Sequence, residues 1–307
     1  MNIGINASNL LMNPSFEAFE AHAKQAAEHG FSSYWLAQAG AIDALTLLGA
    51  LSLRVKGIDF GTAVIPTYPR HPAMLASQAM TAQSISGGRV TLGIGLSHKV
   101  VIEGTYGMSF DKPVRHMREY LSILMALIDE GKVAFEGETL TGRGELAIPG
   151  TKPCPVLVAA LGPQMLRLAG ARTSGTLLWM VGEKTVREHI APLVSEAAAK
   201  AGRPAPQIVA SLPIAVTDDA AGAREVASRA FAMYGQLPSY RAMLDREGAE
   251  GPADVCVFGN ESEVEDRLAA MQEAGATQFS AVEFARDAEA ERTRELLVRW
   301  QNRANTA

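Results

Sequence analysis

The chain has 307 residues, of which 48% are hydrophobic and 20% charged, so it can bury a sizeable core. Its net charge is -5 and its basic residues are scattered, which argues against a nucleic-acid partner, because phosphate binding needs clustered lysine and arginine. No apolar run approaches the roughly 18 residues of a membrane span, so we expect no membrane partner. The chain enters a strand at residue 2 without a basic and apolar leader, and Cys154 and Cys256 lie far apart. These features predict a cytoplasmic protein with two buried, reduced thiols.

Apolar runs alternate with helical patterns along the whole chain. Short apolar or β-branched runs predict eight strands, over 2–6, 32–38, 58–64, 89–96, 155–160, 175–181, 207–216 and 278–284. Apolar residues at three- and four-residue spacing predict helices over 16–29, 43–53, 73–85, 113–130, 161–170, 184–201, 218–233, 261–274 and 287–302.

Local signals mark several of the boundaries. Asp43 is a predicted helix N-cap, and Gly87 supplies the positive φ that commonly ends a helix. Pro66, Pro69 and Pro72 lack the amide donor of a central strand, so we expect no ladder between the third strand and its helix. Residues 98–112 are expected to form a loop.

Two segments depart from the alternation. Residues 132–148 hold charged, strand-like pieces between glycines and predict a small peripheral hairpin. Residues 234–252 hold two tyrosines, two prolines and several charges, and predict an inserted helical segment that folds over one end of the molecule as a lid. Eight strands that alternate with helices predict a single (β/α)8 barrel domain over 1–307. A doubly wound open sheet is the structural alternative.

The working face of such a barrel lies at the carboxyl ends of its strands. Few acids and bases fall there, and this set of residues holds no close carboxylate pair and no metal-ligand spacing, so we expect no metal. A site short of titratable groups indicates that a bound cofactor carries the reaction. The residues that we expect at this face are Asn6, Gln38, Thr62–Ile65, Gly95–His98, Leu161–Gln164 and Trp179–Gly182.

The stretch LGPQMLRLAG (161–170) is the best candidate anion site, because a strand that runs into a helix at Gly162 exposes backbone N–H groups. A tight turn without a ligand is the alternative. Trp179 either walls a ring-shaped ligand or fills the barrel mouth. His98 either faces the site or caps a loop, and His71 is expected to order its loop. Gly93 and Gly95 leave room for something to approach their strand.

The chain resembles the bacterial luciferase-like flavin and deazaflavin oxidoreductases, and within them the actinobacterial branch that uses coenzyme F420. The resemblance runs nearly end to end and is densest in YWLAQ (34–38), GTAVIPTYPRHP (61–72), SGGRVTLGIGLSH (86–98), AALGPQMLRLAG (159–170) and YGQLPSYRAMLDREG (234–248). It implies a (β/α)8 barrel, usually dimeric, with its cofactor at the strand carboxyl ends.

Carried over residue by residue, the resemblance implies a cofactor site. Thr62, Ala63 and Val64 match a bulge beneath the cofactor ring, with a cis peptide bond at Ala63–Val64. The other matching positions are the phosphate-binding segment Leu161, Gly162, Pro163 and Gln164, the ribityl-side loop Gly95, Leu96, Ser97 and His98, and the ring-edge residues Asn6 and Gln38. Trp179 completes the expected cofactor contacts.

One position departs from a known branch. The sugar-phosphate dehydrogenases of this family carry an acid and a histidine where this chain has Gln38 and Ala39, which argues against that activity. A proton must then come from His98, Tyr68, substrate or water. His98 is the predicted catalytic residue, because imidazole titrates near neutral pH.

Three functions follow from these observations. The first is an F420-dependent oxidoreductase that transfers hydride between the deazaflavin C5 and a small organic substrate. The second is an FMN-dependent monooxygenase, and the third is a flavin- or deazaflavin-binding protein without turnover. We also expect a homodimer from the resemblance. The alanines Ala73, Ala76, Ala79 and Ala82 either face the partner or pack on the barrel itself.

Overall fold

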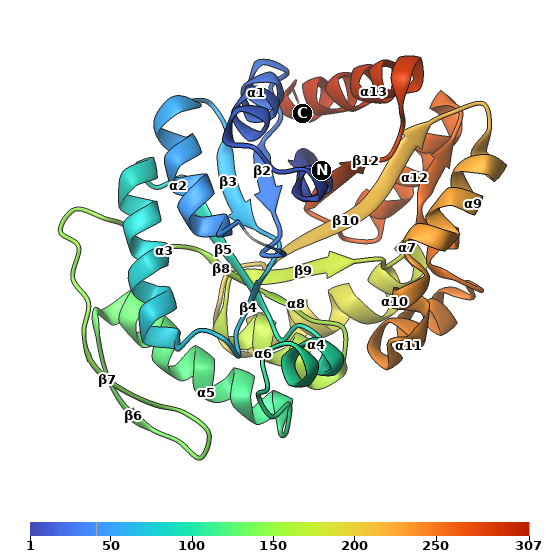
Figure 1. Ribbon diagram of the computed structural model, residues 1–307. Helices are drawn as coiled ribbons and strands as arrows, with labels where there is room; N and C mark the ends of the chain where they lie inside the picture. Colours follow the sequence, from blue (N-terminus) through green and yellow to red (C-terminus); the bar gives the residue numbers. More distant parts are fainter. Residues whose placement is uncertain (41, 307) are drawn as a thin grey trace.

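Eight parallel strands form a closed ring at the centre of the chain (Figure 1). The computed structural model describes residues 1–40 and 42–306. Each strand pairs with its neighbours, and β12 pairs with β1, so the sheet closes on itself. The predicted (β/α)8 barrel is therefore confirmed, and the open-sheet alternative is wrong. The ring consists of β1 (Asn2–Asn6), β2 (Ser33–Leu36), β3 (Asp59–Thr62), β5 (Val90–Gly95), β8 (Val156–Ala159), β9 (Gly175–Trp179), β10 (Gln207–Val216) and β12 (Gln278–Glu283).

Helices surround the ring, because each strand returns to the start of the next through a helical crossover. Pro72 and Pro113 occupy first-turn positions, where the missing N–H costs no hydrogen bond. The crossover helices are α1 (Phe16–Glu28), α2 (Ala44–Arg54), α3 (Pro72–Ser86), α5 (Pro113–Met125) with the π-turn η2 (Ala126–Glu130), α6 (Pro163–Arg172), α7 (Glu183–Thr185) with the π-turn η3 (Val186–Ile190) and α8 (Ala191–Lys200), α9 (Ala220–Ala230), α12 (Glu261–Glu273) and α13 (Asp287–Thr306).

The local features predicted from the sequence, namely the helix caps and the state of the cysteines, are confirmed. The Asp43 carboxylate caps α2 by accepting from the Thr46 N–H at 2.9 Å. Gly87 ends α3 with φ 71°. Both cysteines are buried and free, as predicted. No described helix is long and apolar enough to cross a membrane.

The barrel interior is filled by apolar side chains. Trp35, Leu157, Leu177 and Val209 form a buried cluster. The Trp35 indole N–H donates to Ser33 Oγ at 2.7 Å and to Gln278 Oε1 at 3.0 Å. Alternate residues of the same strands lie in a second, larger cluster with the helices. The interior below the mouth of the barrel is therefore filled by side chains.

Besides the 3-10 turn η1 (Ser8–Met12), three short elements were not predicted. The expectation that Pro66 would prevent a ladder is wrong, because β4 (Ile65–Pro66) pairs with Ile94 and Gly95 of β5. Proline is tolerated there because β4 pairs only with β5, so the missing donor is at an edge. The expected loop 98–112 contains α4 (Lys99–Gly104), and β11 (Val257–Gly259) pairs with the end of the long strand β10. All three are too short for a periodic signal.

The predicted peripheral hairpin is confirmed as β6 (Lys132–Glu136) and β7 (Thr141–Glu145). Its turn is bound to α5 by the Glu119 carboxylate, which accepts the N–H groups of Glu138, Thr139 and Leu140 at 3.0, 2.7 and 2.9 Å. Burial alone would raise the pKa of Glu119, but the hydroxyl and N–H donors at the hairpin turn outweigh it and lower the pKa.

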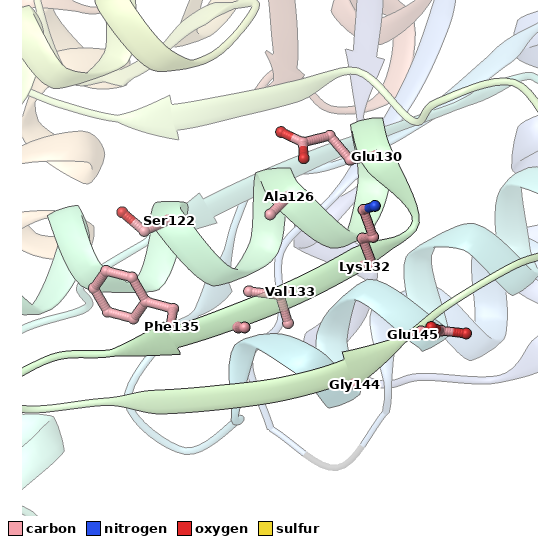
Figure 2. A pocket seen from close by; sticks show the side chains of 9 residues that line it. Ser122, Ala126, Glu130, Lys132, Val133, Phe135, Gly144 and Glu145 are labelled. Atoms are coloured by element: carbon pink, nitrogen blue, oxygen red, sulfur yellow. The ribbon is translucent and has the colours of Figure 1, made fainter.

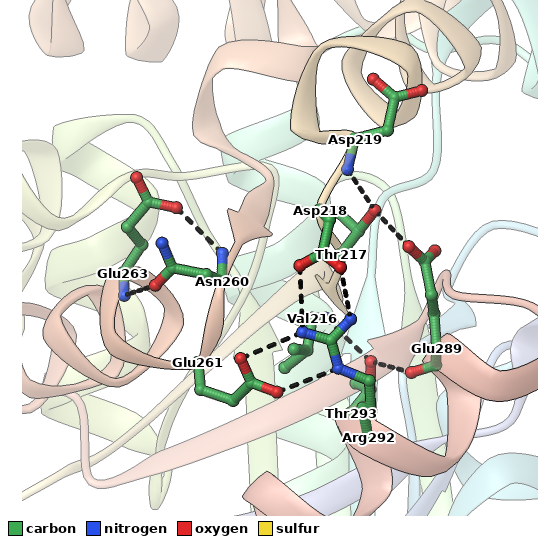
Figure 3. A network of polar contacts seen from close by, with 10 residues as sticks. All are labelled: Val216, Thr217, Asp218, Asp219, Asn260, Glu261, Glu263, Glu289, Arg292 and Thr293. Atoms are coloured by element: carbon green, nitrogen blue, oxygen red, sulfur yellow. Dashed lines mark hydrogen bonds and ion pairs between the residues drawn. The ribbon is translucent and has the colours of Figure 1, made fainter.

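The helical segment after β10 is also present, as α10 (Ala232–Gln236) and α11 (Pro238–Glu247), followed by the 3-10 turn η4 (Pro252–Val255). A polar network next to it joins three elements that lie far apart in the chain (Figure 3). The Arg292 guanidinium of α13 binds Asp218 after β10 at 3.1 Å and Glu261 of α12 at 3.0 Å. This network fixes the start of α12 against α13.

The first strand and the last helix are bound together. The Ile3 N–H donates to Gln301 Oε1 at 2.6 Å, and the Trp300 indole N–H donates to the Met1 carbonyl at 3.1 Å. Together with the β1–β12 pairing, these bonds close the molecule at its seam.

Candidate functional site

The residues expected at the working face lie together at the carboxyl end of the ring. Asn6, Thr62, Gly95 and Trp179 end β1, β3, β5 and β9, and Leu161–Gln164 follow β8. Gln38 lies just beyond β2. Their role in holding a cofactor stays a prediction, but their convergence at one end of one barrel is a property of the structure.

The third strand ends in the expected bulge, and the peptide bond at Ala63–Val64 is cis, as predicted. The Thr62 hydroxyl donates to the Gly93 carbonyl and accepts from the Gly93 N–H, both at 2.8 Å. A Cβ built on Gly93 would overlap the Thr62 carbonyl oxygen, and one on Gly95 would lie 2.8 Å from Val64 Cγ2. The two glycines therefore accommodate the chain's own bulge, and the Thr62 side chain is committed to β5.

The two amide side chains hold neighbouring loops. Gln38 donates to the Ile42 carbonyl at 3.0 Å and accepts from the Ala44 N–H at 2.9 Å. Asn6 donates to Ser211 Oγ at 3.2 Å and accepts from the Ser8 N–H at 3.0 Å. Each NH2 group carries two hydrogens, so each amide retains a second donor beyond these contacts.

The first turn of α6 is an exposed cluster of backbone donors. Gly162 is its N-cap, and among the described residues the Gly162 and Gln164 N–H groups have no acceptor in the chain. Gly162, Pro163 and Gln164 are exposed, and the turn holds no acidic side chain. This donor set, at the positive end of a helix, suits a phosphate or another anion.

An aromatic cluster covers the side of the mouth between β5 and β9. His98, at the start of α4, meets Tyr234 and Tyr240 edge-on, with ring centroids 6.2 and 5.8 Å apart. Trp179 meets Tyr234 and Phe231 at 6.0 and 5.8 Å. The inserted helices therefore contact the ends of two barrel strands, and Phe231 is a member that the sequence did not indicate.

Burial sets the protonation of this cluster. It lowers the pKa of His98, so the imidazole is neutral at pH 7, and it raises the pKa of Tyr240. Burial also raises the pKa of Tyr234, a rise that the nearby Trp179 indole opposes. Within the described chain, Trp179 Nε1 is buried and meets no acceptor with hydrogen-bond geometry. A ligand atom at the mouth would satisfy it.

Two backbone positions beside the cluster are left-handed although they carry side chains. Ser97 has φ 61° and Met180 has φ 53°; Met180 directly follows β9, and Ser97 lies two residues after the end of β5. Such conformations are sparsely populated by non-glycine residues and gather at functional sites. The loops after β5 and β9 are therefore the parts of the rim with such unusual backbone conformations.

Tyr68, the other side chain considered as a proton source, stacks on His116 with centroids 4.0 Å apart and on Phe110 at 5.2 Å. Burial raises the pKa of Tyr68 to about 12, so its hydroxyl stays protonated at neutral pH. His71 binds the Thr141 carbonyl at 2.9 Å and accepts from the Ala73 N–H at 3.3 Å. The prediction that His71 orders its loop is confirmed.

Other concave regions lie away from the mouth. A groove of about 520 Å³ runs between α5 and the β6–β7 hairpin, where Phe135 and Lys132 stand opposite Ser122 and Glu130 (Figure 2). A second, of about 340 Å³, lies between α6 and α8. Neither includes a residue of the candidate site. Among the described residues no group of three His, Cys, Asp or Glu side chains is placed to hold a metal.

Comparisons with known proteins agree with this geometry. A family model described as luciferase-like monooxygenase matches residues 1–278. The 5,10-methylenetetrahydromethanopterin reductase of Archaeoglobus fulgidus is 33% identical over 236 residues, which covers 75% of this chain and 69% of that relative. The structure of the coenzyme F420-dependent tetrahydromethanopterin reductase from Methanopyrus kandleri superposes with a TM-score of 0.79 at 21% identity and covers 97% of both chains. The oxygenating constituent of 3,6-diketocamphane monooxygenase from Pseudomonas putida, in complex with FMN, gives a TM-score of 0.76 at 19% identity over 97% of this chain and 96% of that one.

Proposed function

The chain belongs to the luciferase-like monooxygenase family and is an oxidoreductase, and from this premise we propose that it uses coenzyme F420 to reduce or oxidise a small organic substrate. The relative from Archaeoglobus fulgidus, whose name is that of a reductase, supports this choice within the family. The alternative within the same site is an FMN-dependent monooxygenase, which the FMN-bound neighbour supports at the level of fold.

The observation that carries the proposal is the chemistry of the barrel mouth. Of the fourteen residues expected to contact the cofactor, only His98 carries a side chain whose ordinary pKa lies near neutral pH. The same rim offers unpaired backbone donors at Gly162 and Gln164 and the unpaired Trp179 indole. Groups of this kind bind and orient a phosphorylated ring but cannot carry redox chemistry themselves.

A bound deazaflavin would supply hydride through its C5 carbon, whereas FMN would also react with oxygen. In the proposal, the Gly162 and Gln164 N–H groups would hold the phosphate, and the bulge at Val64 would support the ring. His98 would accept or relay a proton, and Tyr234 and Tyr240 would exclude water from the mouth. Positioning of the two reactants is then the main catalytic contribution of the chain.

The cofactor choice is tested by titrating the purified protein with oxidised F420 and with FMN and following their absorbance and fluorescence. We expect the deazaflavin to bind more tightly. Tighter binding of FMN, with oxygen consumption when reduced FMN is supplied, would replace the proposal by the monooxygenase alternative. Binding of F420 without turnover of enones, imines or quinones would contradict the proposed hydride transfer to these substrate classes.

We further propose a homodimer. Of the alanines considered earlier, Ala76, Ala79 and Ala82 are buried within the chain, where α3 packs on α2, and Ala73 is half-buried. The outer surface of these two helices supports the proposal instead. Residues 72–86, which form α3, contain no charged side chain. The exposed large apolar residues of the two helices are Leu53 on α2 and Met74 and Ile85 on α3.

A further inference from the structure

His189 was not indicated by the sequence and has no part in the chemistry proposed above, yet it touches the phosphate-binding turn. It lies in the π-turn η3, and its side chain is 6% exposed. Its Nε2 lies 2.9 Å from the Leu161 carbonyl oxygen. Because a carbonyl oxygen only accepts, Nε2 is the donor, and the hydrogen bond fixes this ring nitrogen as protonated.

This hydrogen bond sets the direction of the next N–H group. The Leu161 carbonyl and the Gly162 N–H belong to one trans peptide plane and point in opposite directions. A carbonyl held toward buried His189 therefore turns the Gly162 N–H away from the helix layer. Without His189 the Leu161–Gly162 peptide has no side-chain restraint, since Gly162 is exposed and a Cβ built on it meets no described atom within 4 Å.

The position of His189 is itself enforced by packing. The helix that carries it crosses α6 so closely that a Cβ on Gly170 would overlap the Val194 carbonyl oxygen. A π-turn adds a residue to the helical repeat, and such turns are frequent at functional sites. Here the turn brings a buried imidazole against the residue that precedes the α6 N-cap.

We propose that His189 is a positioning residue for the cofactor phosphate. It contacts neither cofactor nor substrate, and acts by holding the Leu161–Gly162 peptide with its N–H toward the phosphate. The inference rests on the proposed function, because it needs a phosphorylated cofactor at this turn. It predicts that His189 contributes to the affinity for phosphate-bearing ligands and not to the affinity for their phosphate-free counterparts.

The test compares FMN with riboflavin, which lacks only the phosphate, and F420 with 7,8-didemethyl-8-hydroxy-5-deazariboflavin, which lacks the phosphate and the tail attached to it. For His189→Leu, which removes the donor and keeps the bulk, we expect the Kd of the phosphate-bearing ligands to rise about tenfold, the effect of one lost hydrogen bond. The Kd of the phosphate-free ligands should change less than twofold. His189→Gln, which restores an N–H donor, should recover part of the loss, and Glu188→Gln, an exposed neighbour, should match the wild type.

Equal weakening of both members of each pair by His189→Leu, or no weakening of either, would overturn the positioning role while leaving the proposed function in place. Failure of the wild type to bind any of the four ligands would overturn the proposed function and this inference with it. If His189→Leu does not fold, His189→Asn gives the same reading, because its shorter side chain does not reach the Leu161 carbonyl. Thermal unfolding of every variant separates lost affinity from lost structure.

Discussion

His98 shows how the environment of one residue decides its chemistry. Burial lowers its pKa from the ordinary 6.5, so at pH 7 it can accept a proton and holds none to give. For His98→Gln, with the cofactor bound, we expect kcat to fall about 100-fold, the smaller end of general acid–base effects, with little change in cofactor Kd. The wild-type kcat/KM should be flat above the lowered pKa and fall as the pH drops through it.

A pH–rate profile measures both effects. His29→Gln, at the end of α1 and outside the candidate site, is the control and should keep the wild-type profile. A His98→Gln enzyme with an unchanged acidic limb would show that another group, such as substrate or water, handles the proton.

Gly93 gives a second prediction for a single residue. A Cβ at this position would overlap the Thr62 carbonyl, so Gly93→Ala must displace the bulge or the strand, and we expect it to lower the free energy of unfolding by about 3 kcal/mol. Gly162→Ala is the matched control, because its Cβ meets no described atom within 4 Å and its φ is -77°. Urea unfolding compares the two. A loss below about 1 kcal/mol in Gly93→Ala would show that the bulge adapts to a methyl group.

Among the elements, the inserted helix α11 is fastened at one end. The Glu247 carboxylate accepts from the Lys184 and Thr185 N–H groups at 3.1 and 2.8 Å and so caps α7, and the Thr185 hydroxyl donates to the Met243 carbonyl at 3.2 Å. The neighbouring α10 is joined to the mouth by aromatic contacts of Tyr234. Tyr240 of α11 also contacts His98, so both helices of the insert meet the mouth and the Glu247 contacts anchor the far end of α11.

Removal of this cap should loosen α11 locally. For Glu247→Ala we expect faster amide hydrogen exchange over 238–247, corresponding to about 1–2 kcal/mol of lost local stability, with exchange in the barrel strands unchanged. Exchange measured by mass spectrometry reports both regions. Arg246→Ala, an exposed neighbour on the same helix, is the control. Uniformly faster exchange in barrel and insert alike would mean that the contact stabilises the whole fold.

At the scale of the whole molecule, the proposed dimer depends on the outer surface of α2 and α3, of which α3 carries no charged side chain. Leu53 and Ile85 are 61% and 44% exposed, each at the end of its helix. A carboxylate buried at each position opposes association, so the double variant Leu53→Glu, Ile85→Glu should be a monomer where the wild type is a dimer. Light scattering at micromolar concentration measures the mass.

The control for this experiment is Met233→Glu, which adds a carboxylate on exposed α10 and should leave the mass unchanged. A wild-type protein that scatters as a monomer would contradict the proposal, and a double variant that remains dimeric would move the interface elsewhere.

The barrel could be predicted from the sequence because each long strand and helix carries its own hydrophobic pattern, as in Gln207–Val216. The residues that begin and end helices, such as Asp43 and Gly87, are also recognisable from the local sequence. What could not be predicted depends on contacts across the fold. Pro66 pairs because its strand is an edge, Gly93 is glycine because the Thr62 carbonyl lies against it, and His189 reaches Leu161 through a π-turn. A lone histidine in an amphipathic helix carries no signal in the sequence.

The β1–β12 seam affects how the protein is made. Among the barrel strands β1 is made first and needs the last, β12, as its partner, so one edge of β1 stays open until the other seven strands have been synthesised. An open edge of this kind can pair with other chains, and nascent copies of this barrel are therefore exposed to misassembly until β12 has been made. Its dependence on chaperones should be greatest during that interval, before the ring has formed.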